Sequence, residues 1–172
     1  MKIKQILIGF VGVAAVSAAA VAAVLTPSFG ILSAPVFVRA SFADTTDLKF
    51  TVRQEFSQFR RGFYSEEVID VTNARETVMQ QIVIAPGGNT GWHTHHGPAV
   101  VLIKSGQMSF YEEDCTLRTY SAGEAFVDSG QGHVHIARNE GSTNLELWVT
   151  YFDVPPGGAF RIDAPNPGNC SF

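Results

Sequence analysis

Short runs of apolar residues, each bounded by turn-forming residues, recur along the chain from residue 50 to residue 153. Runs of this kind, separated by Gly, Asn, Asp and Ser, are typical of the strands and turns of an antiparallel sandwich or barrel. We expect strands at residues 50–56, 77–84, 100–104, 107–112, 124–127, 134–138 and 145–152, and turns at 86–89, 105–106, 121–123 and 139–142. In the last strand, alternation places Leu145, Leu147, Val149 and Tyr151 on one face. The one helical candidate in this region is a short segment at 65–71, so the pattern predicts an all-β fold.

A different pattern precedes these runs. Residues 6–25 contain no charged residue and follow Lys2 and Lys4, which is the composition of either a secretory signal peptide or an uncleaved membrane-anchor helix. Twenty residues is enough to cross a bilayer of about 30 Å, so the length of the run does not separate the two. Small-residue cleavage sites at 38–40 and 41–43 lie well beyond the run. The positive end at Lys2 and Lys4 places everything after the run outside the cytoplasm in both cases. We therefore expect an extracytoplasmic protein, either secreted or membrane-anchored by residues 6–25.

The 172 residues accommodate a single globular domain. We divide the chain into a signal peptide or transmembrane anchor at 1–25, a linker at 26–49 and a β-barrel domain at 50–172. Residues 31–38 of the linker are apolar enough to pack against the domain. Residues 1–43 contain three basic residues and no acidic one, which leaves 9 bases against 16 acids in the remainder, a net charge of −7. Such an acidic domain excludes a nucleic-acid binder of the usual basic kind.

The two cysteines, Cys115 and Cys170, both lie in the part expected to be exported. Because that environment permits oxidation, we predict a disulfide between them that ties the Pro- and Gly-rich tail to the domain. Closing a loop of this length stabilises a fold by about 4 kcal/mol at most in the chain-entropy account. The alternative is a pair of free buried thiols.

All five histidines lie between His93 and His135, and four of them form two His-x-His pairs, His93 with His95 and His133 with His135. Residues i and i+2 of a strand point to the same side, so two such strands facing each other can close around a metal ion. Neutral imidazole is a good ligand for Zn, Mn, Fe, Ni and Cu. The alternative is that these histidines are polar turn residues beside glycines, which two paired sets in one β domain disfavour.

The spacing of these residues resembles the two sequence motifs of the cupin family over roughly residues 77–152. The matching pattern is Gly91-x-His93-x-His95-x-x-x-Ala99-x6-Gly106, followed by Gly123 and by Gly132-x-x-His135-x-x-x-Asn139. The resemblance implies a single-domain, type-2-like cupin with a jelly-roll (double-stranded β-helix) barrel. It also implies that His93, His95 and His135 hold one divalent metal ion inside that barrel.

This sequence departs from the cupin pattern at two places. Ala99 occupies the position of the glutamate that usually completes the first motif, and alanine cannot coordinate a metal. The second motif lacks its proline and has one extra residue, in the stretch Ser129-Gly130-Gln131. Three neutral imidazoles would leave a divalent ion its full +2 charge, which favours an anionic ligand or substrate. His133 shares parity with His135 and can supply a fourth nitrogen, which would close the site to substrate.

The resemblance and the histidine pattern together imply an exported cupin that binds one divalent metal and acts on a small anionic molecule. They favour a metal-dependent dioxygenase, with an isomerase or lyase next. Zinc or manganese is favoured over iron because an exported chain acquires its metal where ferrous iron oxidises, and nickel and copper also suit the ligands. The alternative is a non-catalytic metal- or small-ligand-binding module at the cell surface. Trp148 and Phe152 lie on the face opposite Leu145, where either residues 31–38 or the second subunit of a homodimer can cover them.

Overall fold

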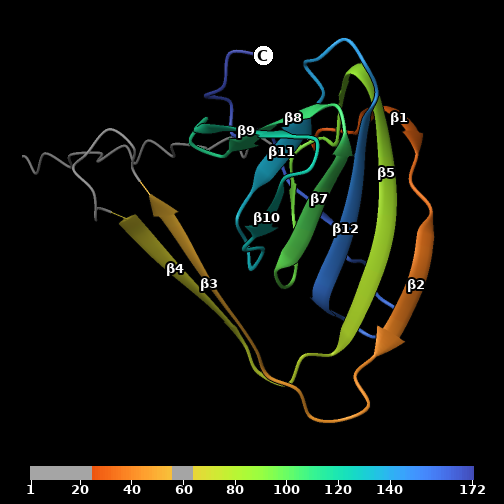
Figure 1. The fold of residues 1–172 in the computed structure, drawn as a ribbon, viewed down its shortest axis with the longest axis vertical. Helices are drawn as coiled ribbons and strands as arrows, with labels where there is room; N and C mark the ends of the chain where they lie inside the picture. Colours follow the sequence, from red (N-terminus) through yellow and green to blue (C-terminus); the bar gives the residue numbers. More distant parts are fainter. Residues whose placement is uncertain (1–24, 56–63) are drawn as a thin grey trace, which may run out of the picture.

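A computed structural model describes residues 25–55 and 64–172 of the chain. The described residues form strands and no helix, as the apolar pattern predicts (Figure 1). None of these residues belongs to a helix long and apolar enough to span a membrane. The expected signal or anchor at 1–25 lies outside the described residues except for Leu25. The strands are β1 (Phe29–Ser33), β2 (Val36–Ser41), β3 (Leu48–Glu55), β4 (Tyr64–Val71), β5 (Glu76–Asn89), β6 (His93–Thr94), β7 (Ala99–Ser105), β8 (Gln107–Glu112), β9 (Leu117–Ser121), β10 (Ala125–Asp128), β11 (His135–Arg138), β12 (Leu145–Val154) and β13 (Ile162–Asp163).

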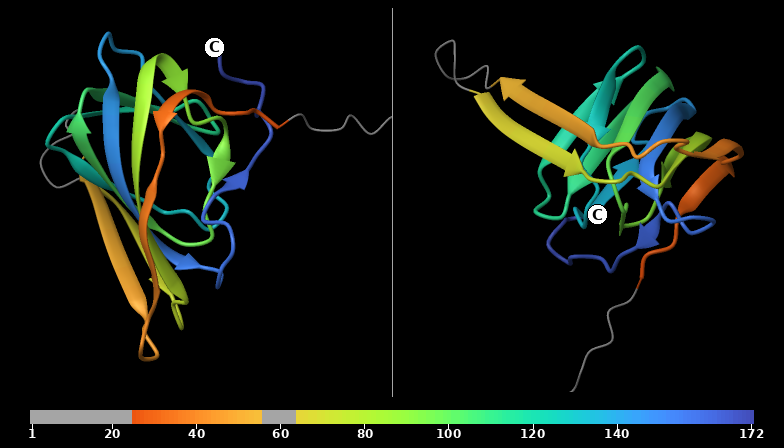
Figure 2. Two further views of the ribbon diagram at one scale, coloured as in Figure 1. Left: turned by 90° about the vertical axis from the view of Figure 1, so that its right-hand side faces the viewer. Right: turned by 90° about the horizontal axis from the view of Figure 1, so that it is seen from below.

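Most of the strands belong to one sheet that curves into a nearly closed barrel (Figures 1 and 2). Its central path runs β10-β7-β12-β5-β11-β6-β13, with β1 and β2 paired to β5, and with β8 joining β11 to β9. The face of β12 that carries Leu145, Leu147, Val149 and Tyr151 points into the barrel, where these residues pack with the inward residues of β5, β7 and β8. The predicted alternation of β12 is therefore confirmed.

Strand β5 is longer than the sequence pattern indicates. The turn expected at residues 86–89 is wrong, because β5 continues to Asn89 and pairs there with β1 and β11. A Cβ at Gly88 would lie 2.8 Å from the carbonyl oxygen of Phe29, so the glycine lets β1 approach the end of β5 closely. Residues 26–49, expected as a linker, thus contribute β1 and β2 to the barrel sheet.

The short helical candidate at 65–71 is also wrong, since these residues lie in β4, which forms a separate two-stranded sheet with β3. Val68, Ile69 and Val71 are β-branched and therefore favour extended backbone. Across the pair, Arg53 Nε donates to Glu66 Oε2 at 2.7 Å. The pair of β3 and β4 projects from the barrel (Figures 1 and 2), so neither strand belongs to the barrel sheet.

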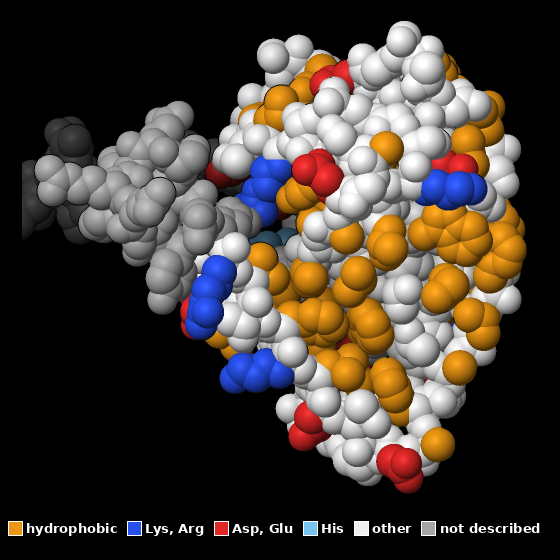
Figure 3. Space-filling model, in the orientation of Figure 1, with side chains coloured by type: hydrophobic (Ala, Val, Ile, Leu, Met, Phe, Trp, Pro, Cys, Tyr) orange, Lys and Arg blue, Asp and Glu red, His pale blue; other side chains and the backbone are white. Residues whose placement is uncertain are grey.

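Trp148 and Phe152 are both covered from within the chain. Phe37 of β2 stacks on Trp148 with ring centroids 5.0 Å apart, so residues 31–38 provide this cover. Phe50 of β3 packs against Phe152 at 5.6 Å. Hydrophobic side chains gather on the face seen in Figure 3. Leu102, the register partner of Trp148, is 45% exposed. A homodimer through this face stays a prediction.

The predicted disulfide is present in the structure, with the Cα atoms of Cys115 and Cys170 5.5 Å apart. It fixes the end of the chain beside the turn between β8 and β9. Beyond it, Phe172 packs against Tyr111 at 4.6 Å between ring centroids, and the Arg138 guanidinium lies 4.0 Å over the Phe172 ring. The tail is thus held against the barrel and does not hang free.

Candidate metal centre

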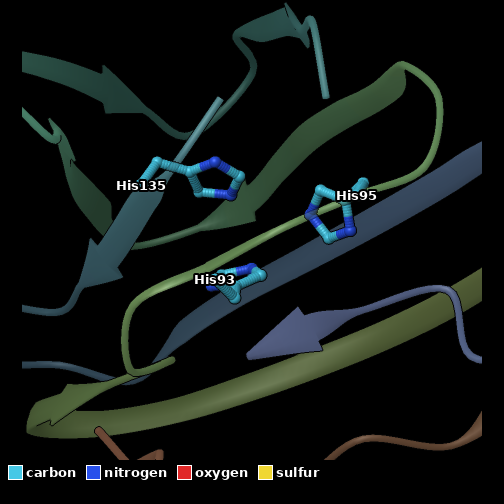
Figure 4. A group of neighbouring side chains, drawn as sticks. All are labelled: His93, His95 and His135. Carbon is cyan, nitrogen blue, oxygen red and sulfur yellow. The ribbon is translucent and has the colours of Figure 1, made fainter. Parts of the chain in front are cut away.

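Three of the five histidines meet inside the barrel (Figure 4). His93 begins β6, His95 follows the same strand, and His135 begins β11, directly opposite His93 in the β6–β11 register. One ring nitrogen of each lies within 4.8 Å of the others, and the three side chains are buried. The i, i+2 spacing of His93 and His95 therefore brings both imidazoles to one site, as the sequence pattern predicts.

Backbone carbonyls orient all three rings. Each Nδ1 lies near a carbonyl oxygen, that of Gly91 for His93 (2.8 Å), of Phe160 for His95 (2.7 Å) and of His133 for His135 (3.3 Å). Because a carbonyl oxygen only accepts hydrogen bonds, each Nδ1 carries the proton and each Nε2 keeps its lone pair. This arrangement leaves Nε2 of every ring available as a metal ligand.

Burial also keeps these imidazoles neutral. It lowers the pKa of His95 to about 4 and that of His135 to about 3, and it lowers the pKa of His93 well below its usual value. The mutual repulsion of the three rings when charged adds to the effect at His93. Near neutral pH the cluster thus presents three unprotonated nitrogens, the form that binds divalent cations.

His133 lies apart from this cluster. Its side chain is exposed and lines a cleft of about 320 Å³ together with Glu112, Glu113 and Asp114. What His133 contributes to the cluster is its backbone carbonyl, which faces Nδ1 of His135. His96 is exposed as well. It follows His95 directly, and consecutive residues of an extended segment point to opposite sides.

A second cleft, of about 270 Å³, opens onto the histidine cluster from outside the barrel. His93, His95 and Tyr151 form its inner end, and Ile31, Ile82 and Phe160 are among its apolar walls. Arg161 also lines it, with its Nε donating to Asp163 Oδ1 at 2.7 Å. Tyr151 is held by a hydrogen bond from its hydroxyl to Gln80 Oε1 at 3.1 Å, and burial raises its pKa above the usual value. A small molecule can therefore reach the two histidines of the first pair.

A buried carboxylate that sequence reasoning missed completes the site. Asp128 ends β10, is 6% exposed, and has its Oδ2 3.3 Å from Nε2 of His135 and 3.5 Å from Nε2 of His95. Burial raises the pKa of its carboxyl group. One signal could have found it, since Asp128 shares strand parity with the apolar Phe126, and both residues line the barrel interior.

The sequence model of the Cupin domain family matches residues 80–155, a range that holds His93, His95, Asp128 and His135. Residues 80–155 therefore form a cupin domain. Its barrel is accordingly a cupin jelly roll, as the resemblance of the two motifs implies. No match to this cupin occurs among the curated proteins.

Several solved structures are similar to parts of this cupin. A cupin-like protein from Thermotoga maritima is 20% identical, with a TM-score of 0.46, over 52% of this chain and 65% of its own. The polyketide cyclase RemF from Streptomyces resistomycificus is 19% identical, with a TM-score of 0.43, over 53% of this chain and 64% of its own. An oxalate oxidase in complex with the substrate analogue glycolate is 26% identical, with a TM-score of 0.41, over 49% of this chain and 45% of its own. The similarity thus spans less than two thirds of each of these three proteins.

The donor set of this cupin fits a divalent metal ion. Three neutral nitrogens lie close together at this site, and a carboxylate oxygen lies beside two of them. A cation is the partner that satisfies such a group of acceptors. Three buried histidines of this cupin could therefore bind a metal ion.

Proposed function

We propose that this cupin binds one divalent metal ion through Nε2 of His93, His95 and His135 and acts on a small anionic molecule, as a metal-dependent dioxygenase. The observation that carries the proposal is the orientation of the three rings, each held by a backbone carbonyl at Nδ1 so that Nε2 faces the shared site. Zinc or manganese ranks ahead of iron because an exported chain acquires its metal where ferrous iron oxidises. Nickel and copper also suit the imidazole donors.

When bound, a divalent ion supplies Lewis-acid chemistry, and a redox-active one can also assist reactions with oxygen. The protein supplies the rest. The three carbonyl contacts hold the imidazoles in one tautomer, so no proton has to leave Nε2 when a ligand binds at pH 7. The apolar walls formed by Ile31, Ile82 and Phe160 limit the water that reaches the site.

The cleft also supports an anionic substrate. Arg161 lines the same cleft as His93 and His95, so a carboxylate or enolate in this space lies between a cationic side chain and the metal site. Asp163 already holds Nε of Arg161, which fixes the guanidinium at the cleft. The cleft is at the small end of ligand pockets, which suits a substrate of a few carbon atoms.

An extracytoplasmic location is part of the proposal. The disulfide between Cys115 and Cys170 favours an oxidising compartment, and the uncharged run at 6–25 has the composition of a signal or an anchor. Both features agree with a protein that acquires its metal outside the cytoplasm.

One observation favours the non-catalytic alternative, a metal-binding module without turnover. Asp128 lies against His95 and His135, and a fourth protein donor would leave a metal of low coordination number no open position. A zinc ion held by all four groups would then be structural, whereas a metal of higher coordination number keeps room for substrate.

Elemental analysis of protein folded with metals supplied tests the proposal. We expect about one divalent ion per chain, lost in His93→Ala and in His135→Ala but retained in His133→Ala, whose exposed side chain makes it the matched control. Wild type loaded with a redox-active ion, manganese or iron, should then consume oxygen with a small anionic substrate, and Arg161→Gln should raise KM more than it lowers kcat. Folded wild-type protein that takes up no metal would refute the proposal. Stoichiometric metal without exchangeable water would favour the binding module.

A further inference from the structure

The first cupin motif has alanine where its glutamate is expected, yet a carboxylate still reaches the site from another strand. We propose that Asp128 is the fourth protein ligand of the metal, and that it takes the role of the side chain missing at Ala99. The inference rests on the proposed metal site and assigns a ligand that the two motifs do not contain.

The strand register places the two residues opposite each other. In the antiparallel pair of β7 and β10, Asp128 is the direct partner of Ala99, and directly opposed residues project to the same face of a sheet. Both side chains are buried, Ala99 completely. The small methyl group of Ala99 therefore leaves space on the interior face next to the position that Asp128 occupies.

The two distances from Asp128 to histidine nitrogens agree with coordination. Donors bound at about 2.1 Å from one metal ion at tetrahedral angles lie about 3.4 Å from each other. Oδ2 of Asp128 lies 3.3 Å from Nε2 of His135 and 3.5 Å from Nε2 of His95. Because those nitrogens carry lone pairs, a charged carboxylate at this separation is repelled unless a cation, either a metal ion or a shared proton, lies between the donors.

The other carboxylate oxygen of Asp128 accepts a hydrogen bond from the backbone. Oδ1 accepts a hydrogen bond from the backbone N–H of Gly130 at 3.1 Å, which turns Oδ2 toward the histidines. A carboxylate oriented by a hydrogen bond of this kind is typical of metal ligands. The side chain is thus prepared to bind through one oxygen.

The altered second motif places a carboxylate where the first motif lacks one. Gly130 lies in the stretch that carries the extra residue of the second motif, and it adopts a φ of 58°. A Cβ at Gly130 would collide with the carbonyl oxygen of Gly97, so only glycine lets this turn pack against the loop before β7. The altered second motif therefore presents the carboxylate at the position where the first motif lacks one.

Coordination by Asp128 changes the charge of the site. Three imidazoles leave a divalent ion at +2, whereas the added carboxylate reduces the net charge to +1. The oxygen donor also favours manganese, iron or zinc over copper(I), which prefers soft ligands. The site then resembles in charge the three-histidine, one-carboxylate set of the cupin pattern, although the carboxylate comes from a different strand.

Metal affinity and a spectroscopic probe test this assignment without any substrate. Dissociation constants for Zn²⁺ and Mn²⁺, measured against a competing chelator, should rise at least tenfold in Asp128→Asn, and the visible bands of Co²⁺ bound to the protein should change in position and intensity. The amide can still donate a hydrogen bond to a histidine Nε2, so this variant keeps a merely structural contact while it removes the ligand. Glu113→Gln, which removes a negative charge from an exposed position of the neighbouring cleft, is the matched control and should stay within twofold.

A second variant tests the replacement directly. In Ala99→Glu/Asp128→Ala the carboxylate moves to the opposite strand, and we expect Zn²⁺ affinity to recover to within tenfold of wild type. Wild-type affinity together with a wild-type Co²⁺ spectrum in Asp128→Asn would overturn the assignment. In that case, loss of metal binding in His135→Ala would show that the three histidines still bind the metal, so the proposed function would survive. If folded wild type binds neither Zn²⁺, Mn²⁺ nor Co²⁺, the assignment and the proposed function are both refuted.

Discussion

Replacing Asn139 with alanine should destabilise this cupin by about 3 kcal/mol. The side chain is completely buried and bridges three backbone groups. Its Nδ2 donates to the carbonyls of Ile84 and Thr143, both at 2.8 Å, and its Oδ1 accepts from the N–H of Gly141 at 3.1 Å. At about 1 kcal/mol for each net hydrogen bond, the three bonds sum to about 3 kcal/mol. Water can replace the side chain at the exposed residues Gly141 and Thr143, but Ile84 is buried.

Chemical denaturation in the presence of a chelator measures this loss without a contribution from bound metal. A loss of about 3 kcal/mol also corresponds to a fall of about 10 °C in Tm for a chain of this size. Asn144→Ala is the matched control, because Asn144 lies in the same loop with an exposed side chain, and it should change the stability by less than about 0.5 kcal/mol. If Asn139→Ala were no less stable than Asn144→Ala, the reasoning that Asn139 bridges β5 to the loop after β11 would be refuted.

Two further predictions concern pH and the disulfide. The pKa of an unfolded histidine is about 6.5, whereas burial holds that of His95 at about 4 and that of His135 at about 3, so the unfolded chain takes up protons first as the pH falls. Metal-free protein should therefore lose about 2 kcal/mol of stability for each of these two residues between pH 7 and pH 5. Denaturation curves that are independent of pH over this range would contradict two buried neutral imidazoles. Reducing the disulfide between Cys115 and Cys170 opens a loop with a sequence separation of 55 and should lower the free energy of unfolding by up to about 4 kcal/mol. An unchanged denaturation midpoint after complete reduction would count against this.

The sequence predicts the part of the site that depends on local spacing. His93 and His95 are two residues apart in an extended segment, so their common direction follows from strand periodicity alone. The position of His135 beside them follows from the motif resemblance. Asp128 was missed because its role depends on the register of β10 against β7, which brings it opposite Ala99. Register is set by packing and turn geometry across the whole sheet, and a single sequence does not display it.

The errors in the predicted fold have similar causes. Pro86, Gly87 and Gly88 have the composition of a turn, but the close approach of β1 at Gly88 makes this stretch part of β5. The segment at 65–71 is too short for its periodicity to separate helix from strand, and pairing with β3 decides for a strand. In both places a partner strand from elsewhere in the chain overrides the local signal.

The central position of β5 has a consequence for how the chain folds. This strand pairs with β2 from the preceding part of the chain and with β12, whose first residue lies more than fifty positions after the last residue of β5. Pairings this distant in sequence raise the contact order and slow folding, because loop-closure entropy must be overcome before the contacts form. During synthesis, a nascent chain that ends before residue 145 has no partner for one edge of β5, and an unpaired edge can template aggregation. Barrel closure, and with it the assembly of the histidine cluster, is therefore a late event that waits for the last long strand.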